Sequence, residues 1–270
     1  MKNLIKKRSD YKPLFWYTKE TFLEFLIFDQ YTIVKAQLIF KKNNSQDIVN
    51  YNLDSNLELN GVDLVTTKFE LILDENPPVN IKIASLKKQN EAILIPVPSN
   101  TYLVKINTEV KIYPSTNNSL EGLYQSNNML CTQCEAEGFR KITWFPDRPD
   151  NLSLFTVRIE VTDKFKTILS NGNLIEAGIV KSKTGKCNRQ FKVWHDPFPK
   201  PSYLFALVVG NLESNTSKFL TSSKKEIQIN IFSEIGNKHF TNYAMKSLKK
   251  AMKWDEEEYG LEYDLDTFMI

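Results

Sequence analysis

Residues 22–40 read FLEFLIFDQYTIVKAQLIF, which is two runs of β-branched and aromatic residues around a polar pair. Both runs, residues 22–28 and 31–40, predict β-strands because these residue types pack well on a pleated surface. Similar runs continue along the first 235 residues, at 67–73, 103–113, 155–165, 190–194, 203–209 and 226–232. Many short strands with regular punctuation predict an all-β sandwich or saddle over roughly residues 1–210.

Turn-forming residues separate these runs. Asn, Gly or Pro cluster at residues 41–44, 60–61, 76–78 and 170–173. We interpret Asn60-Gly61 and Asn171-Gly172 as hairpin turns rather than as phosphate-binding loops. No H-E-x-x-H, G-x-S-x-G or Walker-type motif occurs in the sequence.

The composition is that of a globular protein of one large or two modest domains. Of the 270 residues, 41% are hydrophobic and 25% charged, which excludes disordered and fibrous classes. The formal net charge is only +3, and the cations are 30 Lys against 5 Arg. Readers of nucleic acid favour Arg for bidentate contacts, so we expect no nucleic-acid partner.

The sequence also predicts no membrane partner. The longest uncharged apolar run covers residues 203–209, far short of the roughly 18 residues that a membrane span needs. Three cysteines cannot form a fully paired disulfide framework. A reduced, cytoplasmic compartment is therefore the simplest expectation.

Near residue 237 the hydrophobic period changes from that of a strand to that of a helix. Asn237 is the expected N-cap and Gly260 the expected end of a helix of about six turns. The apolar face is predicted to contain Phe240, Ala244, Leu248, Ala251 and Met252.

The end of this helix is acidic. The carboxylates at residues 255–258 oppose the helix macrodipole, and Lys253 can pair with Glu256 or Glu257. Either these carboxylates form a solvated helix end, or they meet cations in a part of the protein that is not present in this sequence. Residues 261–270 form a strand pattern that stops on apolar residues, so we expect a chain cut inside a domain.

Few residues offer chemistry on their own. Cys131 and Cys134 form a C-x-x-C whose favoured interpretation is two buried structural thiols, because a zinc site needs further paired ligands. His195, in a proline-rich loop at residues 194–201, is expected to be a hydrogen-bonded structural histidine, and His239 to be exposed.

Two glutamates near the C-x-x-C motif have two readings. In an extended segment, Gln133, Glu135 and Glu137 would point to one side and could line a site. Alternatively, the glutamates pair with Arg140 or Arg148 and hold a loop in place. The pattern alone leaves both interpretations open.

Several motifs, taken in order, resemble the aminopeptidase N family of zinc metallo-aminopeptidases, in its bacterial cytoplasmic type. They are LYQS at 123–126, CTQCEAEGFR at 131–140, DRPD at 147–150, LSNGN at 169–173, WHDPFPKP at 194–201, YLFAL at 203–207 and MKWDEE at 252–257. The resemblance covers residues 120–270, while residues 1–119 fit by strand pattern and length.

The resemblance implies a mainly β fold: a saddle-like β-sandwich over residues 1–210, then the opening strand-helix-strand segment of a thermolysin-like catalytic domain over 211–270. The family's G-x-M-E-N and H-E-x-x-H motifs lie further along and do not occur here. One zinc ion is therefore expected on ligands beyond Ile270, with no catalytic residue or metal ligand in this chain. The remaining domains of the same polypeptide are the implied partners.

The resemblance gives one substrate-binding role to this chain. In the family, the first Glu of the Q-C-E-A-E-G-F-R segment helps to bind the substrate's α-amino group, which by position is Glu135, and Gln133 lines the same pocket. A desolvated carboxylate suits this role because its charge-assisted hydrogen bond is worth about 1.5–3 kcal/mol. The expected function is hydrolysis of single residues from peptides with a free N-terminus; the alternative is a non-catalytic β-rich remnant or binding module.

Overall fold

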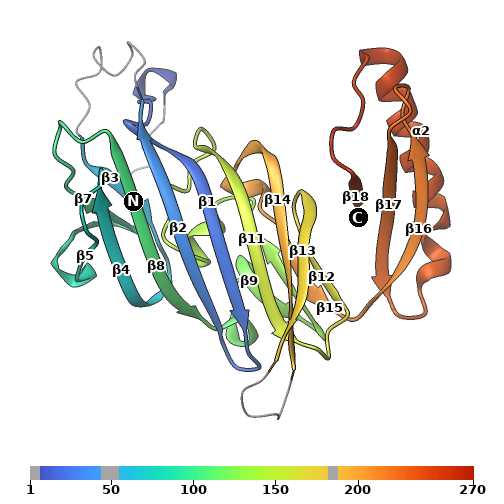
Figure 1. Cartoon of the computed structure of the whole chain (residues 1–270), viewed down its shortest axis with the longest axis horizontal. Coiled ribbons are helices and arrows are strands. Elements are labelled where there is room, and N and C mark those ends of the chain that lie inside the picture. Colours follow the sequence, from blue (N-terminus) through green and yellow to red (C-terminus); the bar gives the residue numbers. More distant parts are fainter. Residues whose placement is uncertain (1–6, 44–54, 182–187) are drawn as a thin grey trace.

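The structure is a computed structural model, which describes residues 7–43, 55–181 and 188–270. The described part is mainly β and confirms that prediction (Figure 1). Its strands form a large sheet, a four-stranded sheet and two three-stranded sheets.

The large sheet has the strand order β13-β14-β11-β1-β2-β8-β4-β5. Its neighbours are antiparallel except β1 and β11, which are parallel and place Glu20 opposite Leu154. The strands are β1 (Trp16–Ile27), β2 (Thr32–Lys42), β4 (Val65–Leu73), β5 (Val79–Asn80), β8 (Leu103–Ile112), β11 (Leu152–Thr162), β13 (Asn173–Val180) and β14 (Arg189–Pro201).

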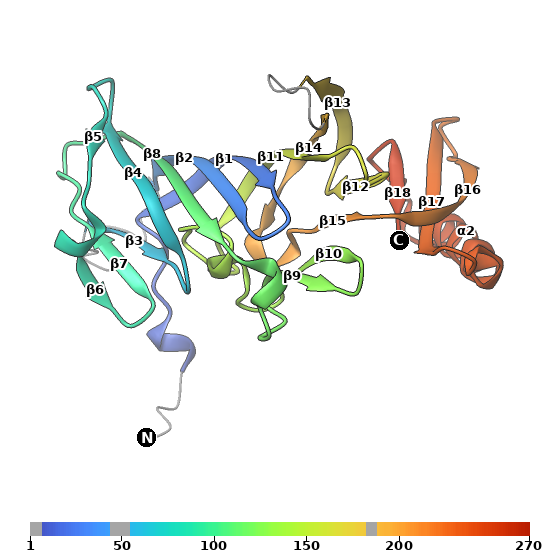
Figure 2. The same ribbon diagram turned by 90° about the horizontal axis from the view of Figure 1, so that it is seen from below.

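Two smaller sheets cover one face of the large sheet (Figure 2). The four-stranded sheet has the order β12 (Thr167–Ser170), β15 (Leu207–Gly210), β10 (Met129–Gln133) and β9 (Gly122–Ser126). The other contains β3 (Leu57–Asn60), β7 (Ala92–Ile95) and β6 (Lys87–Gln89). The core between these layers includes the rings of Phe139, Phe155 and Phe205, each at most 3% exposed; Phe139 meets the other two rings edge to face.

The last sixty residues form a second hydrophobic cluster. Strands β16 (Leu212–Leu220), β17 (Glu226–Glu234) and β18 (Thr267–Met269) form a sheet, with β18 parallel to β17. Helix α2 (Asn242–Tyr259) packs on this sheet through Met245 and Met252, which contact the buried Ile227, Ile229 and Ile231. Short 3₁₀ turns complete the described chain: η1 (Arg8–Asp10), η2 (Ile83–Ser85), η3 (Pro114–Thr116), η4 (Phe139–Lys141), η5 (Ser202–Leu204) and η6 (Lys238–Thr241).

The predicted strands are present, although only Thr267–Met269 of the strand pattern at residues 261–270 is a strand, and two expectations about the connections are wrong. Asn60-Gly61 and Asn171-Gly172 are not hairpin turns, because each joins strands of two different sheets: β3 to β4, and β12 to β13. Residues 202–204 form η5, so only the second half of the predicted strand at 203–209 is a strand. Of the turn predicted at 41–44, residues 41 and 42 continue β2, and Asn44 lies outside the described residues.

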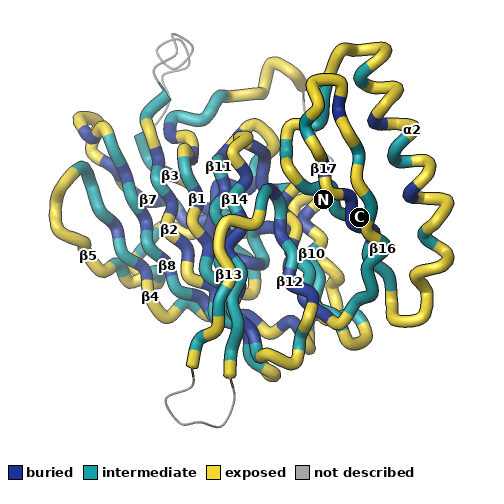
Figure 3. Tube along the Cα trace, turned by 45° about the vertical axis from the view of Figure 1, so that its right-hand side comes forward, coloured by how far each residue is buried: buried dark blue, intermediate teal, exposed yellow. Residues whose placement is uncertain are grey.

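The helix begins later and faces differently from the prediction. Asn237 makes no side-chain cap and precedes η6, whereas Gly260, with φ of 66°, ends α2 as predicted. The buried face contains Met245, Leu248 and Met252, while Ala244 and Ala251 are exposed and Phe240 is 72% exposed (Figure 3). Leu248 and Met252 thus lie on the packed face as predicted, whereas Met245 packs there in place of Ala244, because its longer side chain reaches the sheet. No described helix has both the length and the apolar character that a bilayer crossing requires.

Candidate functional site

The segment that carries Gln133 and Glu135 is a tight turn at the end of β10. Gln133 is the last residue of the strand, and residues 135–138 form the turn, which the Gly138 amide closes on the Cys134 carbonyl at 3.0 Å. The expectation that Gln133, Glu135 and Glu137 share one side of an extended segment is therefore wrong. A Cβ at Gly138 would lie 2.4 Å from the Gln133 carbonyl oxygen, so the turn requires glycine there.

A buried ion pair fixes the base of this turn. The Arg140 Nε and its backbone N–H each donate to Asp147 Oδ2 at 3.1 Å. Asp147 is 3% exposed, and its other carboxylate oxygen accepts a hydrogen bond from Ser202 Oγ at 2.6 Å. Burial lowers the pKa of Arg140, but its bonds to carboxylates outweigh this effect and raise the pKa. The Asp147 carboxylate thus connects Arg140, just after the turn, to Ser202, the first residue of η5.

The two glutamates have different partners. Glu137 pairs with Arg140 Nη2 at 2.8 Å, as the ion-pair interpretation expected, whereas Arg148 pairs with Asp150 at 2.7 Å. Glu135 is exposed, and its carboxylate has no hydrogen bond or ion pair within the described ranges. The Gln133 side chain donates to the Glu135 carbonyl at 2.7 Å, so the structure brings these two residues together.

An open carboxylate on a fixed turn is suited to binding a cation. The turn is held by the Arg140–Asp147 pair, so little conformational freedom is lost when a ligand binds. Glu135 can accept hydrogen bonds from an ammonium without first breaking an internal ion pair.

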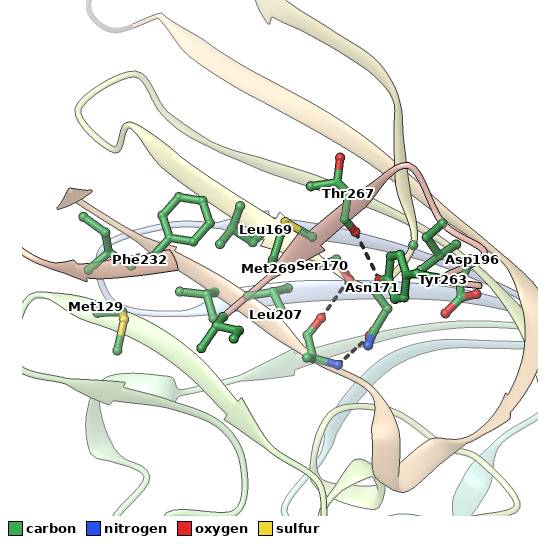
Figure 4. Close-up of a pocket in the computed structure, with 16 residues that line it drawn as sticks. Met129, Leu169, Ser170, Asn171, Asp196, Leu207, Phe232, Tyr263, Thr267 and Met269 are labelled. Atoms are coloured by element: carbon green, nitrogen blue, oxygen red, sulfur yellow. Dashed lines mark hydrogen bonds between the residues drawn. The ribbon is translucent and has the colours of Figure 1, made fainter. Parts of the chain in front are cut away.

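A cavity of about 370 Å³ lies between the four-stranded sheet and the β16–β18 sheet (Figure 4). One end is apolar and the other carries Asn171, Asp196, Tyr263 and Thr267; the apolar residues include Met129, Leu169, Leu207, Phe232 and Met269. Burial, followed by the nearby Asp264 and Asp196, raises the pKa of Tyr263 to about 12. Neither Gln133 nor Glu135 lines this cavity, although the preceding Thr132 accepts a hydrogen bond from Leu207 N at 2.8 Å.

No sequence pattern indicates this cavity, because its walls come from segments far apart in the chain. One lining residue, Asp196, follows His195, which the sequence analysis considered as a functional residue. Asp196 pairs with the buried Lys200 at 2.8 Å. Burial lowers the pKa of Lys200, and the bond to Asp196 opposes this shift.

The histidine and cysteine predictions have mixed outcomes. His195 Nδ1 lies 2.9 Å from Thr156 Oγ1, which confirms a hydrogen-bonded structural role, but it lies on β14 and not in a loop. His239 is exposed, as predicted. Cys134 is buried, and burial raises the pKa of its thiol, whereas Cys131 is only half-buried. Cys187 lies outside the described residues.

No group of three or more His, Cys, Asp or Glu side chains in the described part could hold a metal ion. At the acidic helix end, Lys253 pairs with Glu257 at 3.4 Å. Glu256 accepts hydrogen bonds from the Ser222 backbone N–H and hydroxyl.

Comparison with known proteins shows clear similarity to one group of peptidases. The family model described as the peptidase M1 N-terminal domain matches residues 28–204. Aminopeptidase N of Caulobacter vibrioides is 42% identical over 97% of this chain and 28% of the relative, and aminopeptidase N of Escherichia coli is 40% identical over 98% of this chain and 28% of the relative.

A solved structure is similar over the same extent. The crystal structure of Legionella pneumophila aminopeptidase A in complex with aspartic acid has a TM-score of 0.82 and 30% identity, covering 98% of this chain and 29% of that one. The chain therefore spans somewhat over a quarter of the length of the relatives it matches.

Proposed function

Because this chain belongs to the family of peptidase M1 N-terminal domains, we propose that it forms the first part of a zinc-dependent aminopeptidase that removes single residues from the free N-terminus of peptides. The relatives that match nearly all of it are aminopeptidases. We assign residues 1–210 to the N-terminal β-domain and 211–270 to the start of the catalytic domain. The passage from β15 to β16, which belong to different sheets, supports this boundary.

In this proposal Glu135 binds the α-ammonium of the substrate. The observation that carries the assignment is an exposed carboxylate without an internal partner in the described part, on a turn fixed by a buried ion pair. Glu137, only two residues away, already pairs with Arg140 and is less suited to the role. Gln133 supports the turn through its bond to the Glu135 backbone and borders the same subsite.

The role of Glu135 is to position the substrate rather than to transfer a proton. Holding the ammonium fixes which peptide bond is presented for cleavage, and such positioning can contribute strongly to the rate. We propose that one zinc ion is bound by the part of the polypeptide that corresponds to the rest of the relatives, of which this chain covers 28%. When bound, zinc lowers the pKa of a coordinated water and supplies the nucleophile. We also propose that the substrates of the enzyme are peptides and that the enzyme is located in the cytoplasm.

The test uses the full-length natural protein. Replacing Glu135 by Ala removes the carboxylate, so kcat/KM for an unblocked peptide should fall by about an order of magnitude or more. Glu121→Ala is the matched control, because Glu121 is also exposed and pairs only with Lys141 at the surface, at 2.7 Å. In wild type, kcat/KM should be much lower for N-acetylated peptides than for unblocked peptides. In Glu135→Ala this difference should become smaller.

Unchanged kinetics in Glu135→Ala would refute the anchor assignment. A cellular product of 270 residues that folds cooperatively and hydrolyses no peptide would instead support a non-catalytic β-rich remnant or binding module.

A further inference from the structure

Strand β10, which leads into the turn that carries Glu135, separates from one of its two neighbours before it ends. It lies between β9 and β15, and it pairs with β9 along its whole length. Its pairing with β15 is shorter and stops at Cys131, opposite Val208. One residue further, the same register would place Thr132 opposite Leu207, and this is where the two strands part.

A side chain takes the place of the backbone ladder at this point. The Leu207 backbone N–H donates to Thr132 Oγ1 at 2.8 Å, and the same oxygen lies 3.5 Å from the Leu207 carbonyl oxygen. One hydroxyl, which can both donate and accept, thus faces both backbone groups that Leu207 directs towards β10. Threonine side chains compete with the backbone ladder in this way. The Thr132 hydroxyl therefore ends the β10–β15 pairing and satisfies the Leu207 amide at once.

The Leu207 amide cannot turn to water instead. Leu207 is 0% exposed, and on the other side its strand is paired with β12, where Ser170 lies opposite Leu207. Buried backbone N–H groups in folded proteins are almost always hydrogen-bonded. Without the Thr132 hydroxyl, the next acceptor in register is the backbone carbonyl of residue 132, so the ladder would close by one further pair.

The position of the turn depends on where this ladder stops. Gln133 follows Thr132 directly, and its side chain donates to the Glu135 carbonyl at 2.7 Å. The turn also packs on the Gln133 backbone, because a Cβ at Gly138 would lie 2.4 Å from the Gln133 carbonyl oxygen. Drawing residue 132 towards β15 would therefore move Gln133 and, with it, Glu135.

We infer that Thr132 is a positioning residue for the proposed substrate anchor. Its hydroxyl sets the point at which β10 leaves β15, and so the direction in which Glu135 projects. The Arg140–Asp147 pair holds the other end of the same turn. Thr132 acts through Glu135 and takes no part in the reaction itself, so this inference rests on the proposed role of Glu135.

The test compares two variants of Thr132 in the full-length natural protein. Thr132→Val replaces the hydroxyl by a methyl group, and kcat/KM for an unblocked peptide should fall by about tenfold, because a small misplacement of a positioning group is costly. For the N-acetylated peptide, which has no ammonium to hold, kcat/KM should change by less than about twofold. Thr132→Ser keeps the hydroxyl and should stay within about threefold of wild type for both peptides.

Thr167→Val is the matched control for a general loss of stability. Thr167 lies in the same sheet, and its hydroxyl likewise accepts a backbone N–H, that of Leu212, at 3.2 Å. It is paired with Gly210, at the opposite end of β15 from Leu207. The control should lose stability to urea as Thr132→Val does, but it should keep the wild-type preference for unblocked over N-acetylated peptides.

Two measurements separate this inference from the proposal on which it rests. In a Glu135→Ala background, Thr132→Val should lower kcat/KM by less than about twofold, because effects that pass through one residue do not add. A crystal structure of Thr132→Val requires no activity. It should show the β10–β15 ladder extended to residue 132 and the Glu135 backbone displaced.

Each outcome decides one of the two claims. If Glu135→Ala lowers kcat/KM but Thr132→Val does not, or if the two effects add, only the inference about Thr132 is overturned. A Thr132→Val structure with an unmoved turn overturns it as well, whatever the kinetics. If Glu135→Ala leaves the kinetics unchanged while the turn is displaced in Thr132→Val, the anchor fails but the control of the turn by Thr132 stands.

If Thr132→Val does not fold, Thr132→Ala removes the same oxygen without a branched side chain and is compared with Thr132→Ser in its place. If neither variant folds, the hydroxyl serves the fold as a whole and the inference is overturned.

Discussion

Replacing Asp147 by Asn should destabilise the protein through the Arg140 guanidinium that it leaves behind. The Asp147 and Arg140 side chains are 3% and 11% exposed, and the Asp147 carboxylate accepts three hydrogen bonds: two from Arg140 and one from Ser202. Removing one partner of a buried pair costs about 3–5 kcal/mol. We expect about 3 kcal/mol, the lower end of this range, because Glu91 and Glu137 still contact the guanidinium.

Urea unfolding followed by tryptophan fluorescence measures this change. The matched control is Glu226→Gln, whose partner Lys218 lies 2.7 Å away with side chains 57% and 68% exposed. At such a surface pair we expect a loss of at most about 1 kcal/mol. If the Asp147 variant loses no more than the control, the buried pair does not hold the turn as we argue. In peptidase assays, the same variant should raise KM, because the turn that carries Glu135 loses its support.

Three further predictions concern other parts of the fold. Gly61→Ala should lower the free energy of unfolding by about 1–3 kcal/mol, since its Cβ would lie 2.4 Å from Trp144 Cε3; unchanged chemical denaturation would contradict this. In native protein, alkylation mapped by mass spectrometry should modify Cys131 before Cys134, because burial raises the pKa of the Cys134 thiol; equal rates would contradict burial. Burial raises the pKa of Glu160, but hydrogen bonds from Arg189 and Arg158 outweigh burial and lower this pKa. The stabilisation by Glu160 is therefore complete above the unfolded pKa of about 4.3 and is lost as pH falls through the folded pKa. The stability difference between wild type and Glu160→Gln should therefore shrink below about pH 4, and a constant difference would exclude this linkage.

The strands could be predicted because their signal is local. In β11, every second residue is buried, and β-branched or aromatic residues occupy all of those positions except the first, Ser153. The pairing of strands could not be predicted in this way. Asn171-Gly172 has the residues of a hairpin turn, yet it carries the chain from one sheet to another, because β12 pairs with β15 whereas β13 pairs with the next strand, β14.

The candidate site could be predicted only in part. The resemblance to a family selected Glu135 and Gln133, and the sequence pattern offered Arg140 as a partner for the neighbouring glutamate. The sequence pattern did not reveal that Asp147 is the buried partner of Arg140, because the burial of Asp147 depends on how it packs against η4 and η5.

The parallel pairing of β1 with β11 has a consequence for how the protein is made. Glu20 lies opposite Leu154, so the centre of the large sheet joins residues that leave the ribosome far apart in time. Chain closure over such a distance is entropically costly and slow, and β1 exposes an unpaired edge until β11 arrives. Nascent chains shorter than about 160 residues should therefore depend on chaperones, because the apolar face of β1 and β2 has no complete sheet to join.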